Sequence, residues 1–320
     1  MRVLSDETVA ELLSLDVLLP VVEDAFRRQG RGAVERPDRP HFPVGTDSAG
    51  EAPAGTALTM PAYLHGDDHY ATKLASVHEG NPPERPTVQA QVVVTDARTG
   101  EPLALLAGER ITNARTGCIG GLAVRDLAAG SGPVTLGVVG AGTQARWQTR
   151  AVAAARGVSE ARVFSPSDSR ERCAADLRAD GIDARAVESA REAVEGADAV
   201  ITATTSREPV FPADALSEGV LVVAVGAYTT EMQELDPDVF EGARVFADVP
   251  EEAAETGDLL AADVTDPTPL SDVFEGVVGR TNDDEIVVVA SVGSAVLDAA
   301  AAGLLYGRAV EADAGQSVEF

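Results

Sequence analysis

The spacing of hydrophobic residues divides the chain into a first part rich in short strands and a second part where strands and helices alternate. The first 30 residues have helical periodicity, and Ser5, followed by two acidic residues, fits a helix N-cap. Short apolar runs with turns between them then predict strands. These strands cover residues 55–63, 70–77, 87–96 and 102–107. Neighbouring strands joined by short turns predict a mainly antiparallel sheet.

From residue 109 the pattern becomes that of a doubly wound α/β fold. A predicted helix over 109–129 ends at the Gly-Ser-Gly-Pro run that follows it. Strands and helices then alternate at 134–139, 144–156, 161–164 and 168–179, with further strands at 199–203, 220–225, 245–247 and 286–290. This order is typical of a Rossmann-type parallel sheet with helices on both faces. A last helix over 295–306 can return to the first part, so we predict an α/β protein of two domains, 1–124 plus 295–320 and 125–294.

A glycine-rich turn follows the first strand of the predicted parallel sheet. The letters GAGTQA fit the dinucleotide fingerprint G-x-G-x-x-G/A, with a buried strand before them and a helix after them. In this fingerprint the first glycine permits the tight turn and the second lets the backbone approach a pyrophosphate, which binds at the helix N-terminus. The alternative is a plain tight turn. We expect cofactor contacts from Gly140, Gly142, Thr143, Gln144 and Ala145.

The end of the second strand decides between NAD and NADP, because a carboxylate there binds the ribose 2′-hydroxyl of NAD. In this chain Ser165 follows the strand, and Ser167 and Arg170 come soon after it. Hydroxyl groups and a guanidinium can bind the 2′-phosphate of NADP. NADP is therefore predicted as the preferred cofactor, with NAD as the alternative. The structural alternative is a polar turn in which Ser167 or Asp168 caps the next helix.

The composition argues against several classes of partner. With 25 basic and 52 acidic residues the formal net charge is −27, which disfavours nucleic acid and anionic membrane surfaces. No apolar run approaches the roughly 18 residues of a membrane span, and the acidic N-terminus lacks the apolar core of a signal peptide. Two cysteines, Cys118 and Cys173, make neither a disulfide framework nor a zinc site. We expect a cytoplasmic protein without a metal.

Lysine is almost absent. Only Lys73 is a lysine among the 25 basic residues, and the others are arginines. An acidic shell without surface lysine is what adaptation to high salt would produce, since salt screens the self-repulsion. In such a chain Lys73, which lies inside an apolar strand run, is a candidate for chemistry. An edge-strand lysine that blocks sheet pairing is the alternative. Arg115 and Arg39 are candidates to hold a small carboxylate, because a guanidinium binds a carboxylate through two hydrogen bonds.

Several segments together resemble the ornithine cyclodeaminase/mu-crystallin family. They are ERPDRP, the segment from Lys73 to Pro83, DARTGEPLALL, ITNARTG, GVVGAGTQA, ADAVITATTS, VGAYTTEMQELDP and ASVGSAVLDA, and together they span nearly the whole chain. The resemblance implies NAD(P)-dependent chemistry on small amino or imino acids. It also implies a homodimer whose first domain makes the subunit contact and binds the substrate. Members include ornithine cyclodeaminases, alanine dehydrogenases and ketimine reductases.

The resemblance also implies roles for particular residues. Lys73 and Arg115 match the lysine and arginine that bind and polarise the substrate, with Arg39 as the partner of its carboxylate. Thr87 and Met60 are expected on the substrate side. The residues expected near the dinucleotide from the matching cofactor motifs are Thr204, Thr205 and Ser291. Asp298, on the last predicted helix, is a candidate to face the nicotinamide pocket, and an ordinary solvent-facing position on that helix is the alternative.

One departure from the family pattern bears on the reaction. Cyclodeaminases of the family carry a catalytic Asp in the loop after the fifth strand of the cofactor domain, where this chain has Tyr228. A carboxylate accepts a proton near neutral pH, whereas Tyr, with a pKa of roughly 10, does so poorly. We therefore expect hydride transfer at the α-carbon of a small amino or imino acid, as in ketimine reductases or alanine dehydrogenases. Tyr228 is expected at the catalytic site, where it lines the pocket or donates a hydrogen bond, and a loop residue that packs against the cofactor is the alternative. Ornithine cyclodeamination, or NADP binding without turnover as in a crystallin, are the alternatives.

Overall fold

The computed structural model of the chain describes residues 1–46, 50, 52–78, 80–82 and 85–319. The chain divides into two compact units: unit 1 is Met1–Arg115 with Ala295–Phe320, and unit 2 is Thr116–Ser294. The division falls inside one long helix, α3 (Gly108–Leu127), and so lies before the boundary predicted at residue 124. Glu79 and Pro83 of the family-like segment after Lys73 lie outside the described residues.

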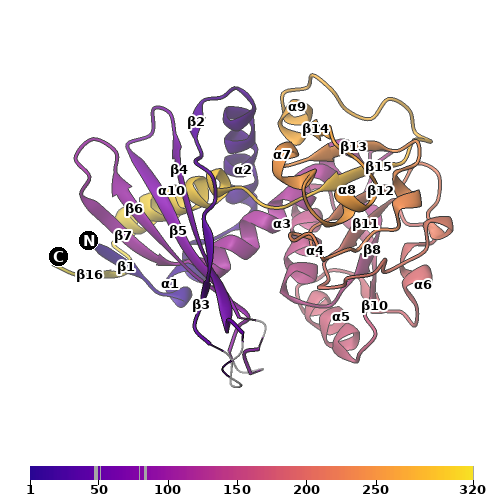
Figure 1. Cartoon of the computed structure of the whole chain (residues 1–320), viewed down its shortest axis with the longest axis horizontal. Coiled ribbons are helices and arrows are strands. Elements are labelled where there is room, and N and C mark those ends of the chain that lie inside the picture. Colours follow the sequence, from indigo (N-terminus) through magenta and orange to yellow (C-terminus); the bar gives the residue numbers. More distant parts are fainter. Residues whose placement is uncertain (47–49, 51, 79, 83–84, 320) are drawn as a thin grey trace. The chain divides into compact units, whose positions relative to one another are not determined.

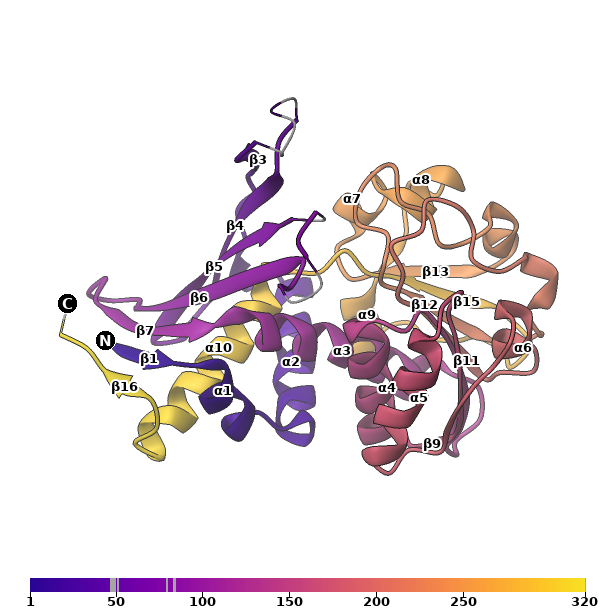
Figure 2. The same cartoon turned by 90° about the horizontal axis from the view of Figure 1, so that it is seen from below.

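Unit 1 is built on a mostly antiparallel sheet. Its strand order is β16-β1-β7-β6-β5-β4-β2 with β3 paired to β4, and β1 with β7 is a parallel pair. Helices α1, α2 and α10 lie on one side of this sheet (Figures 1 and 2). The elements of unit 1 besides α3 are β1 (Arg2–Leu4), α1 (Asp6–Leu12), α2 (Leu15–Gly30), β2 (Val34–Glu35), β3 (His41–Val44), β4 (Gly55–Leu64), β5 (His69–Val77), β6 (Val88–Asp96), β7 (Pro102–Ala107), α10 (Ala295–Glu311) and β16 (Gln316–Ser317).

The strands predicted for the first part are present as β4 to β7, each with ends within one residue of the prediction. Ser5 caps α1 as expected, since its hydroxyl accepts a hydrogen bond from the amide of Thr8 at 3.3 Å. The prediction of helix for the first residues was wrong for Arg2–Leu4, because these residues form strand β1, which pairs with β7. Three residues are too few to show a period of two, so this strand forms because a neighbouring strand is available.

Unit 2 contains the predicted doubly wound sheet, in which the strands are parallel in the order β10-β9-β8-β11-β12-β15-β13-β14. Its elements are β8 (Val134–Val139), α4 (Thr143–Ala155), β9 (Val158–Phe164), α5 (Ser169–Ala179), β10 (Ala184–Ala186), α6 (Ala190–Val194), β11 (Ala199–Thr202), η1 (Ala213–Ala215), β12 (Leu221–Ala224), η2 (Pro237–Phe240), β13 (Arg244–Ala247), α7 (Pro250–Ala253), α8 (Gly257–Ala261), β14 (Thr268–Pro269), α9 (Leu270–Phe274) and β15 (Val287–Ala290).

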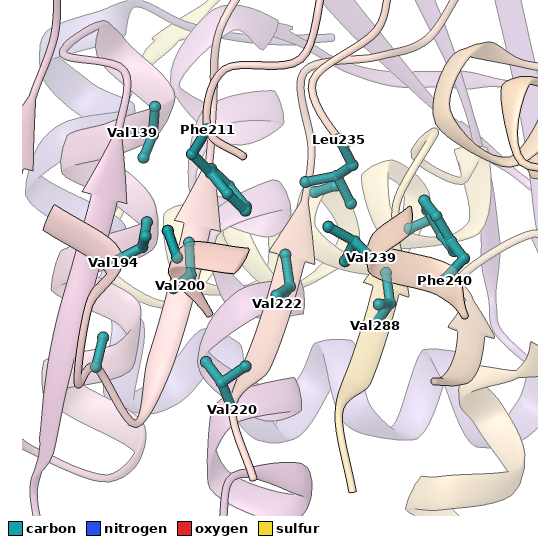
Figure 3. Close-up of a cluster of buried hydrophobic side chains, with 14 of the residues drawn as sticks. Val139, Val194, Val200, Phe211, Val220, Val222, Leu235, Val239, Phe240 and Val288 are labelled. Carbon is teal, nitrogen blue, oxygen red and sulfur yellow. The ribbon is translucent and has the colours of Figure 1, made fainter. Parts of the chain in front are cut away.

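Two faces of this sheet are covered in different ways. On one face Val200, Val222 and Val288 of the central strands pack with Val194 of α6 and Phe240 of η2 in a buried apolar cluster (Figure 3). On α3 the backbone itself approaches α4. A Cβ on Gly117 or Gly121 would lie 2.7 Å from a carbonyl oxygen of α4. This close packing explains why the second half of α3 belongs to unit 2 although the first half does not.

Between β8 and β11 the chain changes the side on which it adds strands to the sheet. Strands β9 and β10 extend the sheet to one side of β8, and β11 and β12 extend it to the other side. In open parallel sheets ligands bind at the carboxyl ends of the strands at such a point. Within the described residues, no helix combines the length and the hydropathy needed to cross a membrane.

Candidate active site

Lys73 lies in the interior of the unit 1 sheet. It is on β5, which is hydrogen-bonded to β4 on one side and to β6 on the other, so the alternative of an edge-strand lysine is wrong. Alternation along the strand directs Ala71 and Lys73 to the buried side, whereas Tyr70 and Leu74 are exposed. Only 3% of the surface of Lys73 is exposed. A buried ammonium group requires a partner.

That partner is Asp298, in the first turn of α10. Its Oδ2 accepts a hydrogen bond from Lys73 Nζ at 2.6 Å, and its Oδ1 accepts one from Arg115 Nε at 3.0 Å. Arg115 is carried by α3 and is also buried, with 4% of its surface exposed. Strand β5 and helices α3 and α10 therefore bring two cations and one anion together. We call these three residues the charged triad.

The three residues of the charged triad carry a net positive charge, since Asp298 balances only one of the two cations. Among the described residues, Nη1 of Arg115 is buried and has no hydrogen-bond partner. Burial is the main reason that the pKa of Lys73 falls to about 8, with Asp298 opposing the fall and Arg115 adding to it. Burial raises the pKa of Asp298, but the charges of Arg115 and Lys73 outweigh this and hold it below its usual value. The arrangement can therefore bind an anion and exchange a proton near neutral pH.

The other substrate-side candidates have different positions. Met60 is buried on β4, directly opposite Lys73 in the sheet. The half-buried Arg39 is close enough for its charge to lower the pKa of Lys73. Thr87 is exposed just before β6, and its carbonyl oxygen accepts a hydrogen bond from the amide of His78.

In unit 2 the glycine-rich turn has the geometry that the fingerprint requires. Gly140 has a φ of 111°, and a Cβ there would lie 2.3 Å from the carbonyl oxygen of Ala203. Gly142 is the N-cap of α4 and makes no side-chain cap, and a Cβ on it would meet no described atom within 4 Å. The first-turn amides of α4, which begins at Thr143, therefore lack an intrahelical partner beside open space. This cradle fits a pyrophosphate.

Neighbouring residues hold this turn in place. Ala145 is fully buried beneath it, as close helix–strand packing requires. Gln144 is half-buried, and its Oε1 lies 3.4 Å from Nε2 of Gln148. Arg146, which the sequence did not single out, donates from Nη1 to the carbonyl oxygens of Ala141 at 2.6 Å and Gly142 at 3.1 Å.

The turn after β9 contains hydroxyl groups and one guanidinium but no carboxylate at its first position. Ser165 Oγ lies 2.8 Å from Ser169 Oγ, which lies 2.8 Å from Ser167 Oγ. Arg170 donates to the carbonyl oxygen of Ser165 and to Glu188, and its Nε is buried without a hydrogen-bond partner in the described part of the chain. The capping alternative holds only for Ser167, whose hydroxyl accepts from the amide of Ser169 at 3.3 Å.

The remaining cofactor candidates follow the carboxyl ends of neighbouring strands. After β11, the amide of Thr204 donates to the buried Glu234, and Thr205 is exposed. After β15, the hydroxyl of Ser291 donates to Asp248 at 2.7 Å, so this side chain already has a partner within the protein. After β12, Tyr228 is 44% exposed.

Sequence reasoning missed most of the buried carboxylates at these places. Asp298 was noticed only as a helix residue that could face a nicotinamide pocket or solvent. The available signal was that it is the one charged residue in an otherwise apolar run from Ala295 to Tyr306. Glu234 and Asp248 lie in loops with many acidic residues, and no local signal separates them from the exposed ones. The described residues contain no group of three or more potential metal ligands.

Known proteins resemble this chain over nearly its whole length. Residues 1–313 match the sequence model of the ornithine cyclodeaminase/mu-crystallin family. The chain belongs to this family. The resemblance found in its motifs is thereby confirmed. An alanine dehydrogenase from Archaeoglobus fulgidus is 32% identical over an alignment of 331 positions, which covers 99% of this chain and 98% of the relative.

Solved structures of family members have the same fold. The Δ1-pyrroline-2-carboxylate reductase of Thermococcus litoralis, in complex with NADH and L-proline, is 33% identical and superposes with a TM-score of 0.91 over 99% of this chain and 100% of that one. An archaeal alanine dehydrogenase dimer with bound NAD is 29% identical, with a TM-score of 0.91 over 100% of this chain and 99% of that one. The predicted fold class is confirmed.

Replacing Asp298 with Asn is expected to destabilise the protein strongly. The variant leaves Lys73 and Arg115 buried without an anion, and breaking a buried ion pair lowers the free energy of unfolding by about 3–5 kcal/mol. The matched control is Asp6→Asn, which removes the partly exposed ion pair with Arg110 and is expected to change that free energy by less than about 1 kcal/mol. Urea unfolding at pH 7 measures both. Equal, small effects would show that the charged triad does not stabilise the fold.

Proposed function

We propose that this protein is an NAD(P)-dependent oxidoreductase that transfers hydride to or from the α-carbon of a small amino or imino acid. The observation that carries the proposal is the net positive charge of the charged triad, together with the buried Nη1 of Arg115, which has no hydrogen-bond partner in the described part of the chain. A site with this charge is suited to one small carboxylate. The relatives support the same reaction class, since they include an alanine dehydrogenase and a Δ1-pyrroline-2-carboxylate reductase.

Each residue of the charged triad has a distinct task in this proposal. Arg115, assisted by Arg39, holds the substrate carboxylate. Lys73 donates a hydrogen bond to the nitrogen or oxygen of the C=N or C=O group, polarises it and supplies the proton that this atom gains on reduction. Asp298 holds the ammonium group in position and keeps it charged against the effect of burial. Met60 and Thr87 form part of the substrate side, and Tyr228 lines the pocket.

The fingerprint turn and the adjoining strand ends are the proposed nicotinamide dinucleotide site. Gly140, Gly142 and the first turn of α4 fit the pyrophosphate, as their geometry in unit 2 indicates. When bound, the nicotinamide supplies or accepts the hydride. NADP is the proposed preference, because Ser165, Ser167 and Arg170 stand where a carboxylate would bind the 2′-hydroxyl of NAD. The two solved relatives hold NADH or NAD, so this preference rests on the residues of this chain alone. The residues completing the proposed site are Thr143, Gln144, Ala145, Thr204, Thr205 and Ser291.

The protein is proposed to work as a homodimer in a cytoplasm of high salt. The relative with bound NAD is a dimer. In unit 1 the helices pack on one side of the sheet (Figure 2), and on the other side Tyr70 and Leu74 are 36% and 38% exposed. This sheet side is the proposed subunit contact. The net charge of −27 and the single lysine support the high-salt environment.

Two alternatives differ from this proposal in measurable products. Ornithine cyclodeamination would release ammonia and form proline, and it would need a proton acceptor where this chain has Tyr228. A crystallin-like protein would bind the dinucleotide without turnover. Steady-state oxidation of NADPH and NADH in molar KCl, with cyclic imino acids or with pyruvate plus ammonia, separates these functions.

Lys73→Ala is expected to lower turnover by roughly 10²-fold or more, because it removes a charge that acts mainly in the transition state. The variant leaves Arg115 and Asp298 as a balanced pair, so the protein should stay folded and bind the cofactor as before. Lys73→Arg should fail as well, because a planar fork cannot replace a compact ammonium. Thr72→Ser, one position along β5 and directed to the other side of the sheet, is the control. Near-normal turnover by Lys73→Ala would refute the assigned role.

The rate of reduction is expected to decrease as the pH rises through about 8, because Lys73 has a pKa of about 8 and must be protonated to donate a proton. The oxidative direction needs the neutral amine, so its rate should increase over the same range. The charge of Arg39 lowers the pKa of Lys73, so Arg39→Gln should move both midpoints upward. Profiles of kcat/KM against pH measure these ionisations. Profiles without an ionisation between pH 7 and pH 9 would contradict the proton-donor role.

Ser165→Asp is expected to change the cofactor preference from NADPH to NADH. A carboxylate at this position accepts a hydrogen bond from the 2′-hydroxyl and repels a 2′-phosphate. Ser165→Asn is the control, because it has nearly the same shape as Asp without the charge. Isothermal titration of both cofactors against the wild type and both variants gives the dissociation constants. Wild-type affinity for NADH equal to or above that for NADPH would overturn the preference.

A further inference from the structure

A single buried carboxylate joins two loops of unit 2. Glu234 has no exposed surface. Its Oε1 accepts a hydrogen bond from the amide of Thr204 at 2.6 Å, and its Oε2 accepts from the hydroxyl of Thr202 at 2.8 Å and from the amide of Gly226 at 2.7 Å. Thr202 ends β11, Thr204 lies in the loop after it, and Gly226 lies in the loop after β12. One side chain therefore fixes the chain at the ends of two adjacent strands.

The position of the first loop also determines the space at the glycine-rich turn. Gly140 lies so close to Ala203 that a Cβ would come within 2.3 Å of its carbonyl oxygen. Ala203 immediately precedes Thr204, whose amide Glu234 holds. A shift of the loop after β11 would therefore move the backbone of Ala203, against which the glycine-rich turn packs at Gly140.

The second loop is closed by the same side chain. It runs from Gly226 to Glu234 and contains Tyr228 between them. A Cβ on Gly226 would lie 2.5 Å from the carboxyl group of Glu234, so the carboxylate fits directly against the backbone. In the loop that carries Tyr228, the amide of the first residue, Gly226, is thus hydrogen-bonded to the side chain of the last residue, Glu234.

The backbone of Glu234 is itself fixed from the other side. Asp258, on α8, accepts hydrogen bonds at Oδ1 from the amides of Glu234 at 2.7 Å and Leu235 at 2.8 Å. The side chain of Leu235 lies in the apolar cluster with Val239 (Figure 3). The backbone of Glu234 is therefore held by α8, and the residue that follows it is anchored in the apolar cluster.

We propose that Glu234 is a positioning residue of the cofactor site, which fixes the loops after β11 and β12 and so sets the places of Thr204 and Tyr228 for the dinucleotide. The proposal rests on the proposed function for the ligand, because it assumes that a nicotinamide dinucleotide binds beside the glycine-rich turn. The part of the proposal that concerns the loops does not depend on the proposed function, because the order of the loops can be measured without any ligand.

Ionisation of Glu234 gives the proposal a pH signature. Burial, and secondarily the charge of Asp258, raises the pKa of Glu234 to about 7. Asp258 is the charged group that faces it, while its hydrogen-bonding neighbours Thr202, Thr204 and Gly226 carry no titratable side chain. Burial also raises the pKa of Asp258, to about 6. When Glu234 is protonated, one acceptor oxygen becomes a donor that faces other donors. The hydrogen bonds from Thr202 and Thr204 favour the charged form and oppose the effect of burial on this pKa. As long as Glu234 stays buried, the loops are therefore held more firmly when it is charged and loosen as the pH falls through about 7, although burial itself favours the protonated form.

The test compares the wild type with Glu234→Gln, which keeps the size of the side chain but places an NH₂ group against backbone amides. Asp236→Ala is the matched control, because it removes a carboxylate from the same segment whose partner, the amide of Asp238, belongs to η2. The first measurement is the protection of the Thr204 and Gly226 amides from hydrogen exchange in the unliganded protein. The second is the dissociation constant of NADPH and NADH by fluorescence titration at pH 6 and pH 8.

In Glu234→Gln we expect protection of these two amides to fall ~10-fold and the dissociation constant at pH 8 to rise ~10-fold, since buried donors lose their acceptor. The wild type should bind more weakly at pH 6 than at pH 8, and the variant should lose this difference. Asp236→Ala should resemble the wild type in both measurements.

Unchanged protection and affinity in Glu234→Gln would overturn the proposal, as would a lower melting temperature with unchanged affinity, which is the result of a purely structural role. If Glu234→Gln does not fold, Glu234→Asp takes its place, because it keeps the charge but shortens the side chain by one methylene group; unchanged protection and affinity in that variant would overturn the proposal. Absence of any dinucleotide binding by the folded wild type would instead refute the proposed function, and the loss of amide protection would still show whether Glu234 holds the loops.

Discussion

A buried surplus of positive charge constrains unit 1. In the interior of a protein a charge is stable only with a partner of opposite sign, and Asp298 supplies one for Lys73 and Arg115 together. The three residues come from a central strand, from the first turn of α10 and from α3, so these elements must keep their positions for the charges to stay paired. The net positive charge that remains costs stability on its own. The proposed carboxylate substrate would offset that cost by supplying a second anion.

Unit 2 uses buried charge of the opposite sign for a different purpose. Glu234, Asp248 and Asp258 are buried carboxylates whose oxygens accept hydrogen bonds from backbone amides. A carboxylate that several amides satisfy is a strong crosslink, because each of these bonds is charge-assisted. The segments joined in this way follow β11, β12 and β15, at the carboxyl ends of the strands, where ligands of this fold bind. Hydrogen bonds to buried carboxylates can therefore hold these loops in place without a large apolar core beneath them.

The sequence allowed most of the framework to be predicted, because hydrophobic period and turn chemistry are local. The glycine-rich turn and strands β4 to β8 are examples, and each element was recognisable from its own residues. The charged triad could be predicted only in part. Lys73 stood out by composition, but its partner lies 225 positions away, and no local pattern connects them. For the same reason Glu234 could not be separated from nearby acidic residues, since burial comes from tertiary packing and not from the letters around it. The strand at Arg2–Leu4 was missed because only its partner strand gives it a structure.

The single lysine of the chain can be understood from the difference between surface and buried charges. Salt weakens exposed ion pairs, such as Arg110 with Asp6, but has less effect on the buried pair of Lys73 and Asp298, whose side chains are only 4% and 2% exposed. On a surface, arginine can replace lysine, because either group serves as a solvated cation. In the charged triad the proposed proton transfer requires lysine, since a guanidinium stays protonated at any physiological pH, whereas burial brings the pKa of the Lys73 ammonium group to about 8. The proposed role therefore accounts for the one lysine in a chain that otherwise uses arginine.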